Sequence, residues 1–148
     1  MSVNPFDIRT VLLAKHAQHV VLVHFPIALC TTAVAFDFLA LRTKSQALIT
    51  AAYFNLLLAA GSTVPVVVTG LAAWQWALEG QRLKGILLMH LVLGGLSTVL
   101  IWIVFWIHFR ARAPGKLLPG YRLPIETISL LVMAVTGHLG GFVSGVNG

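Results

Sequence analysis

The sequence predicts an all-α integral membrane protein, an up-down bundle of four transmembrane helices. Of its 148 residues, 58% are hydrophobic and only 9% are charged. A water-soluble domain has about 25% charged residues, so this chain has too few charges to cover an aqueous surface. The charges divide it into four apolar runs, each reaching the roughly 20 residues with which a helix crosses a bilayer. Short polar segments join the runs, as expected between antiparallel neighbours in a bundle.

The four runs lie within one expected domain, and each must be helical because a lone strand would leave backbone groups unsatisfied in lipid. The expected helices cover about 17–41, 48–78, 85–109 and 123–146 of the domain 1–148. The joining segments read RTKSQA, EGQRLK and RARAPGKLLPGYR. No cleavable signal peptide is expected, because the first run exceeds a signal h-region and no small-x-small site follows it.

The net charge of +6 does not indicate a nucleic-acid partner, because the ten basic residues lie at the ends of the apolar runs and form no single patch. Their distribution instead predicts how the helices are oriented in the membrane. We name the end of the bundle that faces the N-terminus side A and the opposite end side B. Side A has Arg9, Lys15, Arg82 and Lys84, and side B has Arg42, Lys44, Arg110, Arg112, Lys116 and Arg122. Basic residues are enriched on the cytoplasmic side. The sequence therefore predicts a multi-pass protein of the bacterial inner membrane with both termini in the periplasm.

Three histidines fall inside the runs at one depth. His24, His90 and His138 lie on three different helices, each about 9–15 Å inside side A at 1.5 Å of helix rise per residue. Ionisable groups in a transmembrane span are costly and tend to face the interior of the bundle or a functional pathway. We therefore expect the three imidazoles within about 12–15 Å of each other, the span of a haem with its two ligands. Pro26 is expected either to kink the first helix next to this site or to mark the start of a helix.

Haem b is the first candidate cofactor for such a site, since its iron takes two neutral imidazoles and its porphyrin prefers apolar walls. His24 and His90 would be the axial ligands, and His138 a substitute ligand or a hydrogen-bonding partner. Arg82 and Lys84 lie on side A, where the propionates would emerge. A single copper, zinc or iron ion held by the three histidines is the alternative.

The other histidines, His16, His19 and His108, are expected to be interfacial or hydrogen-bonding residues. Cys30 is the only cysteine, which excludes an internal disulfide, a covalent c-type haem attachment and a thiolate zinc site.

Two acidic residues enter the runs from side B. Asp37 is expected to pair with Arg42, one helical turn away; the alternative is a proton-carrying acid at a quinone pocket. Glu126 opens the fourth run, where its charge suits the positive end of the helix dipole. No site for a hard cation is expected.

Several segments resemble a family of small bacterial four-helix membrane proteins of unknown function. They are HVVLVHFPIAL, FDFLAL, TGLAAW, MHLVLG and GHLGG, of which HFPIAL and GHLGG are the most specific. The resemblance implies an all-helical bundle whose architecture is similar to di-haem b-type cytochromes, and some relatives are fused or adjacent to iron–sulfur redox domains. The family histidines match His19, His24, His90 and His138. The chain departs from the family pattern at Val20, where proline is usual, and at Gly94, where asparagine is frequent.

Two functions from different classes remain. One is a haem b-binding electron-transfer subunit that works with quinol and with other membrane or periplasmic redox subunits. The other is a non-catalytic accessory subunit whose histidines serve helix packing in a larger membrane complex. A stand-alone enzyme is not expected, because no nucleophile–base pair, phosphate-binding loop or hydrolase motif is present.

Overall fold

The computed structural model describes residues 17–76, 78–80, 82–114 and 117–144. Its helices are α2 (Ala17–Leu22), α3 (His24–Thr43), α4 (Gln46–Trp76), α5 (Gly85–Ala111) and α6 (Arg122–Val143). They form four segments long and apolar enough to cross a membrane, the first of which, Gln18–Thr43, combines α2 and α3. The predicted all-α fold with four membrane-spanning helices in an up-down bundle is confirmed. His16, Arg9, Lys15 and Lys116 lie outside the described residues.

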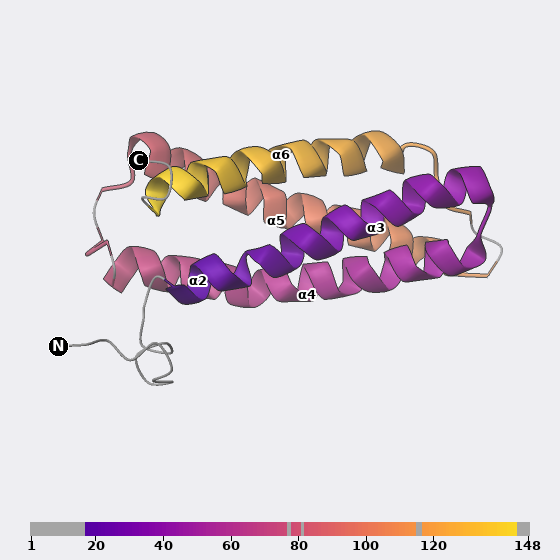
Figure 1. The fold of residues 1–148 in the computed structure, drawn as a ribbon, viewed down its shortest axis with the longest axis horizontal. Helices are drawn as coiled ribbons and strands as arrows, with labels where there is room; N and C mark the ends of the chain where they lie inside the picture. The colour runs from indigo at the N-terminus through magenta and orange to yellow at the C-terminus, as the bar shows by residue number, and fades with distance from the viewer. Residues whose placement is uncertain (1–16, 77, 81, 115–116, 145–148) are drawn as a thin grey trace.

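The bundle consists of two helical hairpins. α3 packs along α4, and α5 packs along α6; the hairpins meet mainly between α4 and α5 and, less extensively, between α3 and α6. α2 begins and α6 ends at the same end of the bundle, which is side A (Figure 1). The turns between α3 and α4 and between α5 and α6 lie at side B, so each hairpin runs from side A to side B and back.

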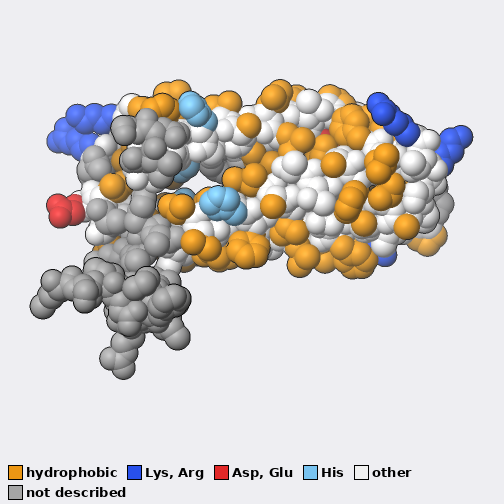
Figure 2. All heavy atoms as spheres, in the orientation of Figure 1, with side chains coloured by type: hydrophobic (Ala, Val, Ile, Leu, Met, Phe, Trp, Pro, Cys, Tyr) orange, Lys and Arg blue, Asp and Glu red, His pale blue; other side chains and the backbone are white. Residues whose placement is uncertain are grey.

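Small side chains let the helices approach closely in the centre. The buried core includes Cys30, Ala33, Ala52, Ala59 and Ala60, together with larger residues such as Leu56 and Phe105. Small residues such as alanine are enriched where helices pack closely in lipid. Large apolar side chains instead cover the outside of the bundle, with Lys and Arg at its two ends (Figure 2). This apolar exterior is the surface that a lipid bilayer covers.

The first membrane span breaks where Pro26 requires it. α2 ends at Leu22 and α3 begins at His24, with a turn at Val23 between them. Pro26 has no backbone N–H and cannot bond to the carbonyl of Leu22, so the helix loses one link of its ladder there. The helix is therefore interrupted at Val23, and Pro26 lies in the first turn of the new helix α3, as both expectations for this proline allow. α2 packs against α4.

Candidate functional site

Side A contains a cavity of about 320 Å³ between the two hairpins, lined by side chains from all of the helices. Its walls are mostly apolar or glycine, and three imidazoles face it: His19, His24 and His90. A mostly apolar cavity with a few convergent polar groups is the usual form of a cofactor or ligand site. Histidine side chains are visible at the surface toward this end of the bundle (Figure 2).

His19 is held against the partner helix of its hairpin. Its Nδ1 lies 3.1 Å from the carbonyl oxygen of Val66 on α4. A carbonyl accepts, so Nδ1 carries the proton. The ring also packs on Gly70, where a Cβ atom would lie only 2.9 Å from the His19 Cε1. Glycine at this position therefore leaves the room that the imidazole occupies.

His90 repeats this arrangement in the second hairpin. Its Nδ1 donates to the carbonyl of Thr136 on α6 at 3.1 Å, and a Cβ atom at Gly140 would lie 3.0 Å from its Cε1. In both hairpins the accepting carbonyl lies four residues before the glycine. The residues that follow are also alike, since His19 opens HVVL and His90 opens HLVL. The two hairpins thus present one imidazole each in the same way.

The two repeated imidazoles lie next to each other across the hairpin boundary. Their ring centroids are 6.4 Å apart, and the rings are nearly perpendicular, at 84°. Both residues also line a second, apolar cavity of about 180 Å³ that extends past Trp74 and Leu83. The His19–His90 pair therefore lies where the two cavities adjoin.

The other expected site residues lie in different surroundings. His24 is exposed, lines the first cavity, and donates through Nδ1 to the carbonyl of Val20 one turn earlier, at 2.7 Å. His138 is also exposed, packs edge-on against Phe142 of its own helix at 5.1 Å, and lines neither cavity. Arg82 and Lys84 are exposed and flank Leu83 at the second cavity. The structure thus brings His24 and His90 to one cavity but leaves His138 outside it.

The tautomer of these imidazoles is the one that metal ligation needs. A neutral ring that donates through Nδ1 carries its lone pair on Nε2. Metal-binding histidines are commonly oriented by such a bond from their other ring nitrogen to a backbone carbonyl. His90 and His24 both have this arrangement, and His19 makes the matching Nδ1 contact. His24 and His90 are therefore imidazoles of this cavity whose Nε2 atoms could serve as metal ligands.

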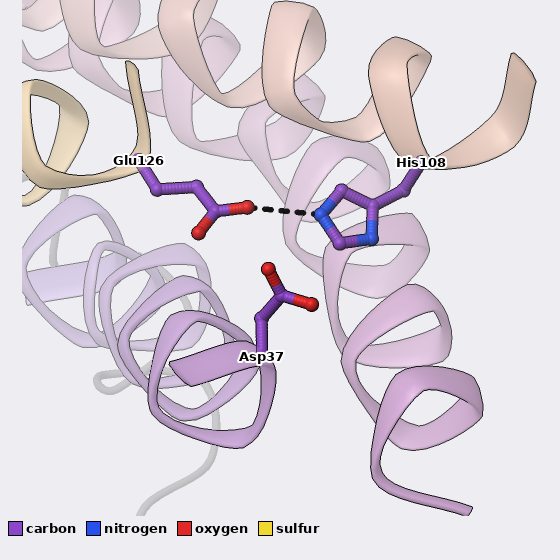
Figure 3. A group of neighbouring side chains, drawn as sticks. All are labelled: Asp37, His108 and Glu126. Carbon is purple, nitrogen blue, oxygen red and sulfur yellow. Dashed lines mark hydrogen bonds and ion pairs between the residues drawn. The ribbon is translucent and has the colours of Figure 1, made fainter. Parts of the chain in front are cut away.

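Side B contains a second polar site that is buried instead of hollow. Asp37 of α3, His108 of α5 and Glu126 of α6 are 0%, 2% and 0% exposed, and their side chains point toward one another (Figure 3). His108 Nε2 donates to Glu126 Oε1 at 2.9 Å, and Arg122 donates through Nε to Asp37 Oδ2. One ligand atom from each of the three residues lies within 4.8 Å of the others, so this buried cluster could hold a metal ion.

This buried cluster corrects two expectations. Asp37 pairs with Arg122 and not with Arg42, which is exposed. Glu126 faces inward to His108 instead of serving the helix dipole. Of the two roles expected for His108, the structure has the hydrogen-bonding one, with the side chain buried. The cause is geometric, because Arg122 and Glu126 are four residues apart and occupy one face of α6, which turns toward α3.

The depth of these residues could have identified the cluster from the sequence. Asp37 precedes the end of the first run by a few residues, His108 lies at the end of the third, and Glu126 lies at the start of the fourth. All three therefore lie at a similar depth from side B, by the same reasoning that grouped the histidines of side A. Because Asp37 was expected to pair with Arg42 of its own helix, its common depth with His108 and Glu126 was not used.

A family comparison adds to this geometry. The profile of a family described as predicted membrane proteins, DUF2231, matches residues 15–147. The chain belongs to the DUF2231 family. Neither the curated proteins nor the solved structures gave a significant match. The family match covers both hairpins of this DUF2231 protein, and so includes the side-A cavity and the buried cluster of side B.

Proposed function

We propose that this DUF2231 protein binds haem b between His19 and His90 and transfers electrons between a quinol and a redox partner in or next to the membrane. The observation that carries the proposal is the pair of imidazoles, one from each hairpin, that lie side by side with their Nδ1 atoms on backbone carbonyls. His90 was expected as a ligand from the sequence, and His19 takes the place first given to His24.

The separation of the two rings fits axial ligation of one iron. With a metal–nitrogen bond of about 2.0–2.1 Å, and roughly 1.1 Å from nitrogen to ring centre, two opposed imidazoles have centroids about 6.3 Å apart. The centroids of His19 and His90 are 6.4 Å apart. Imidazoles bound to one ion with a tetrahedral angle would lie closer, at about 5 Å by the same bond length. The spacing thus matches opposed ligands better than a tetrahedral ion, and it is also within the range of an edge-to-face contact between two rings.

The surrounding space favours a flat macrocycle. Two cavities, of about 320 and 180 Å³, adjoin at the His19–His90 pair, and both are lined largely by apolar residues. A porphyrin extends to both sides of its iron and prefers such walls. The exposed cations Arg82 and Lys84 flank the second cavity at Leu83, where they would neutralise propionates at the membrane surface. Haem supplies one-electron chemistry when it is bound.

The chain itself would orient the ligands and exclude water. The carbonyls of Val66 and Thr136 fix the rings of His19 and His90 and raise the basicity of their Nε2 atoms. Gly70 and Gly140 leave room for those rings. From the basic residues of side B, we assign side A to the periplasmic face of a bacterial inner membrane. A periplasmic partner would therefore exchange electrons at side A.

The visible spectrum of the purified full-length protein, expressed with ample haem, tests the proposal. We expect the split bands of a low-spin b-type haem after reduction, and haem that acid acetone extracts, because the chain has a single cysteine and cannot attach haem through a pair. His19→Ala and His90→Ala should each abolish the bands. His138→Ala removes an exposed imidazole of the same end and should leave them intact.

Three other results would contradict the proposal. A colourless protein whose copper or zinc ion is lost in His90→Ala but kept in Glu126→Gln would assign the side-A histidines to a metal site. A colourless, folded protein without any metal at side A would favour the accessory subunit. If the bands survive in His19→Ala and disappear in His138→Ala, the axial ligand is His138 and not His19.

A further inference from the structure

We propose that Asp37, His108 and Glu126 form a binding site for one divalent transition-metal ion, separate from the haem site proposed for side A. The three side chains come from three helices and meet inside the bundle at side B. A metal ion there would join α3 of the first hairpin to α5 and α6 of the second.

The buried cluster contains polar atoms that make no hydrogen bond. Asp37 Oδ1, His108 Nδ1 and Glu126 Oε2 are buried and have no hydrogen-bond partner. Arg122 does not supply one, because its Nε donates to the other oxygen of Asp37 and its Nη1 donates to the carbonyl of Pro119. Buried polar atoms without partners are rare, and each calls for an explanation.

The unpartnered atoms are all lone-pair donors. The oxygens belong to carboxylates, and His108 donates its proton from Nε2 to Glu126, which leaves the lone pair on Nδ1. A single proton satisfies at most one oxygen and the acceptor it faces, whereas a metal ion accepts lone pairs from all three residues at once. The chemistry of the donor atoms therefore points to a Lewis acid.

The donor set selects the class of ion. Two carboxylates and one imidazole suit zinc, manganese or ferrous iron, while calcium and magnesium prefer oxygen ligands alone. Arg122 lies beside the carboxylates and opposes any cation by repulsion. This repulsion further disfavours ions that bind by charge alone, and leaves those that form strong bonds to nitrogen.

The distances allow the site to close with small movements. Bond lengths of about 2.0–2.2 Å place the ligand atoms of a tetrahedral site about 3.5 Å apart. The ligand atoms here lie within 4.8 Å of each other, so side-chain shifts on the order of 1 Å would suffice. Arg122 would then act as the partner that orients the carboxylate of Asp37.

A polar cavity at side B borders the His108 side of the cluster. The cavity has a volume of about 250 Å³ and is lined by His108 together with residues such as Tyr53, Thr50 and Arg112. Arg112 lies over the ring of Tyr53, 4.3 Å from its centroid. His108 thus belongs both to the buried cluster and to the cavity that leads toward the surface.

Metal titration of the full-length protein, purified in detergent without chelator, tests the site. The probes are Zn²⁺, counted by elemental analysis, and Co²⁺, followed by its visible absorption. We expect about one ion per chain, with affinity at least 10-fold weaker in Glu126→Gln and in His108→Ala, since changes at ligands and their partners weaken sites by about that much or more. The control variants His138→Ala and Glu79→Gln remove an exposed imidazole and an exposed carboxylate, and should bind as the wild type does.

X-ray absorption of the Zn²⁺-loaded wild type tests the ligands without any variant. One imidazole nitrogen together with oxygen ligands is the expected coordination, and two or three imidazoles would place the ion at side A and overturn the proposal. Folded wild type that binds neither ion would also overturn it. The same holds if saturating Zn²⁺ leaves a protonated carboxyl band in the infrared spectrum that only Glu126→Gln removes, because a proton would then occupy the cluster. Glu126→Gln and His108→Ala change side B alone, and His19→Ala and His90→Ala change side A alone, so failure of this proposal and failure of the haem proposal are distinguishable.

Discussion

The two ends of the bundle use polar groups in opposite ways. At side A, imidazoles border cavities and bond to backbone carbonyls, and glycines leave room around them. At side B, charged side chains from both hairpins are buried and bond mainly to one another. Backbone carbonyls orient the imidazoles at side A, while an ion pair at side B joins α3 of one hairpin to α6 of the other. The two ends therefore differ in what their polar groups contact: backbone and cavity at side A, and other charged side chains at side B.

Replacing Arg122 should have the largest effect on stability, because it removes the cation of a buried ion pair at side B. In Arg122→Leu the buried carboxylate of Asp37 loses its cationic partner. Breaking a buried ion pair in this way costs about 3–5 kcal/mol, so we expect much less folded protein and a far lower thermal midpoint in detergent. Arg42→Leu removes an exposed arginine of the same end and should change stability little. Equal stability of the two variants would show that side B does not hold the hairpins together.

Adding one methyl group beneath the imidazoles should weaken the cofactor site while the bundle stays folded. In Gly70→Ala or Gly140→Ala the new Cβ meets Cε1 of the histidine at 2.9 or 3.0 Å, so the ring must shift. Displacing a ligand's support typically lowers metal affinity 10–100-fold, which we expect for haem retained per chain. Gly61→Ala, whose Cβ meets nothing within 4 Å, is the matched control in the same helix as Gly70. Haem loss in Gly61→Ala as well would mean that the effect is on the helix and not on the ring.

The smallest expected effect lies between the two ends. Ser97 of α5 and Thr136 of α6 share a hydrogen bond of 3.1 Å between their hydroxyls. Interhelical hydrogen bonds in membranes contribute about 0.6 kcal/mol on average, so Ser97→Ala should lower the free energy of unfolding by that amount. Thr98→Ala removes a hydroxyl that bonds within α5 and serves as the control for stability. A loss well above 1 kcal/mol would mean that Ser97 stabilises the bundle by more than this one hydrogen bond.

The fold was predictable because lipid imposes a simple rule on composition and length. Apolar runs between charges identified all four membrane-spanning helices, and depth along the helices brought His24 and His90 to one cavity. Which face of each helix is turned inward could not be predicted in the same way, because lipid-facing and core-facing residues are both apolar. For that reason the exposed position of His138 and the inward position of His19 became visible only in the structure.

The cluster of side B was missed for a different reason. Pairing Asp37 with its sequence neighbour Arg42 gave a sufficient local explanation, while the observed partner, Arg122, lies 85 residues away. Contacts between distant segments depend on which helix faces become neighbours, and a single sequence does not state that. The small residues that let α3 and α4 pack closely were visible, but their partners across the interface were not.

The matching environments of His19 and His90 have a consequence for the ancestry of the protein. His19 and His90 are 71 positions apart, and so are Asp37 and His108. Both hairpins start and end at side A, which is the relative direction found in parallel repeats of membrane transporters. One such hairpin paired with its own copy would already set two imidazoles face to face, because a two-fold interface presents each residue to its equivalent. A fused pair of such hairpins would have the arrangement seen at side A, while Asp37 and His108 occupy corresponding positions with different residues at side B. Single-hairpin proteins with histidine, carbonyl and glycine at this spacing are where such an origin could be tested.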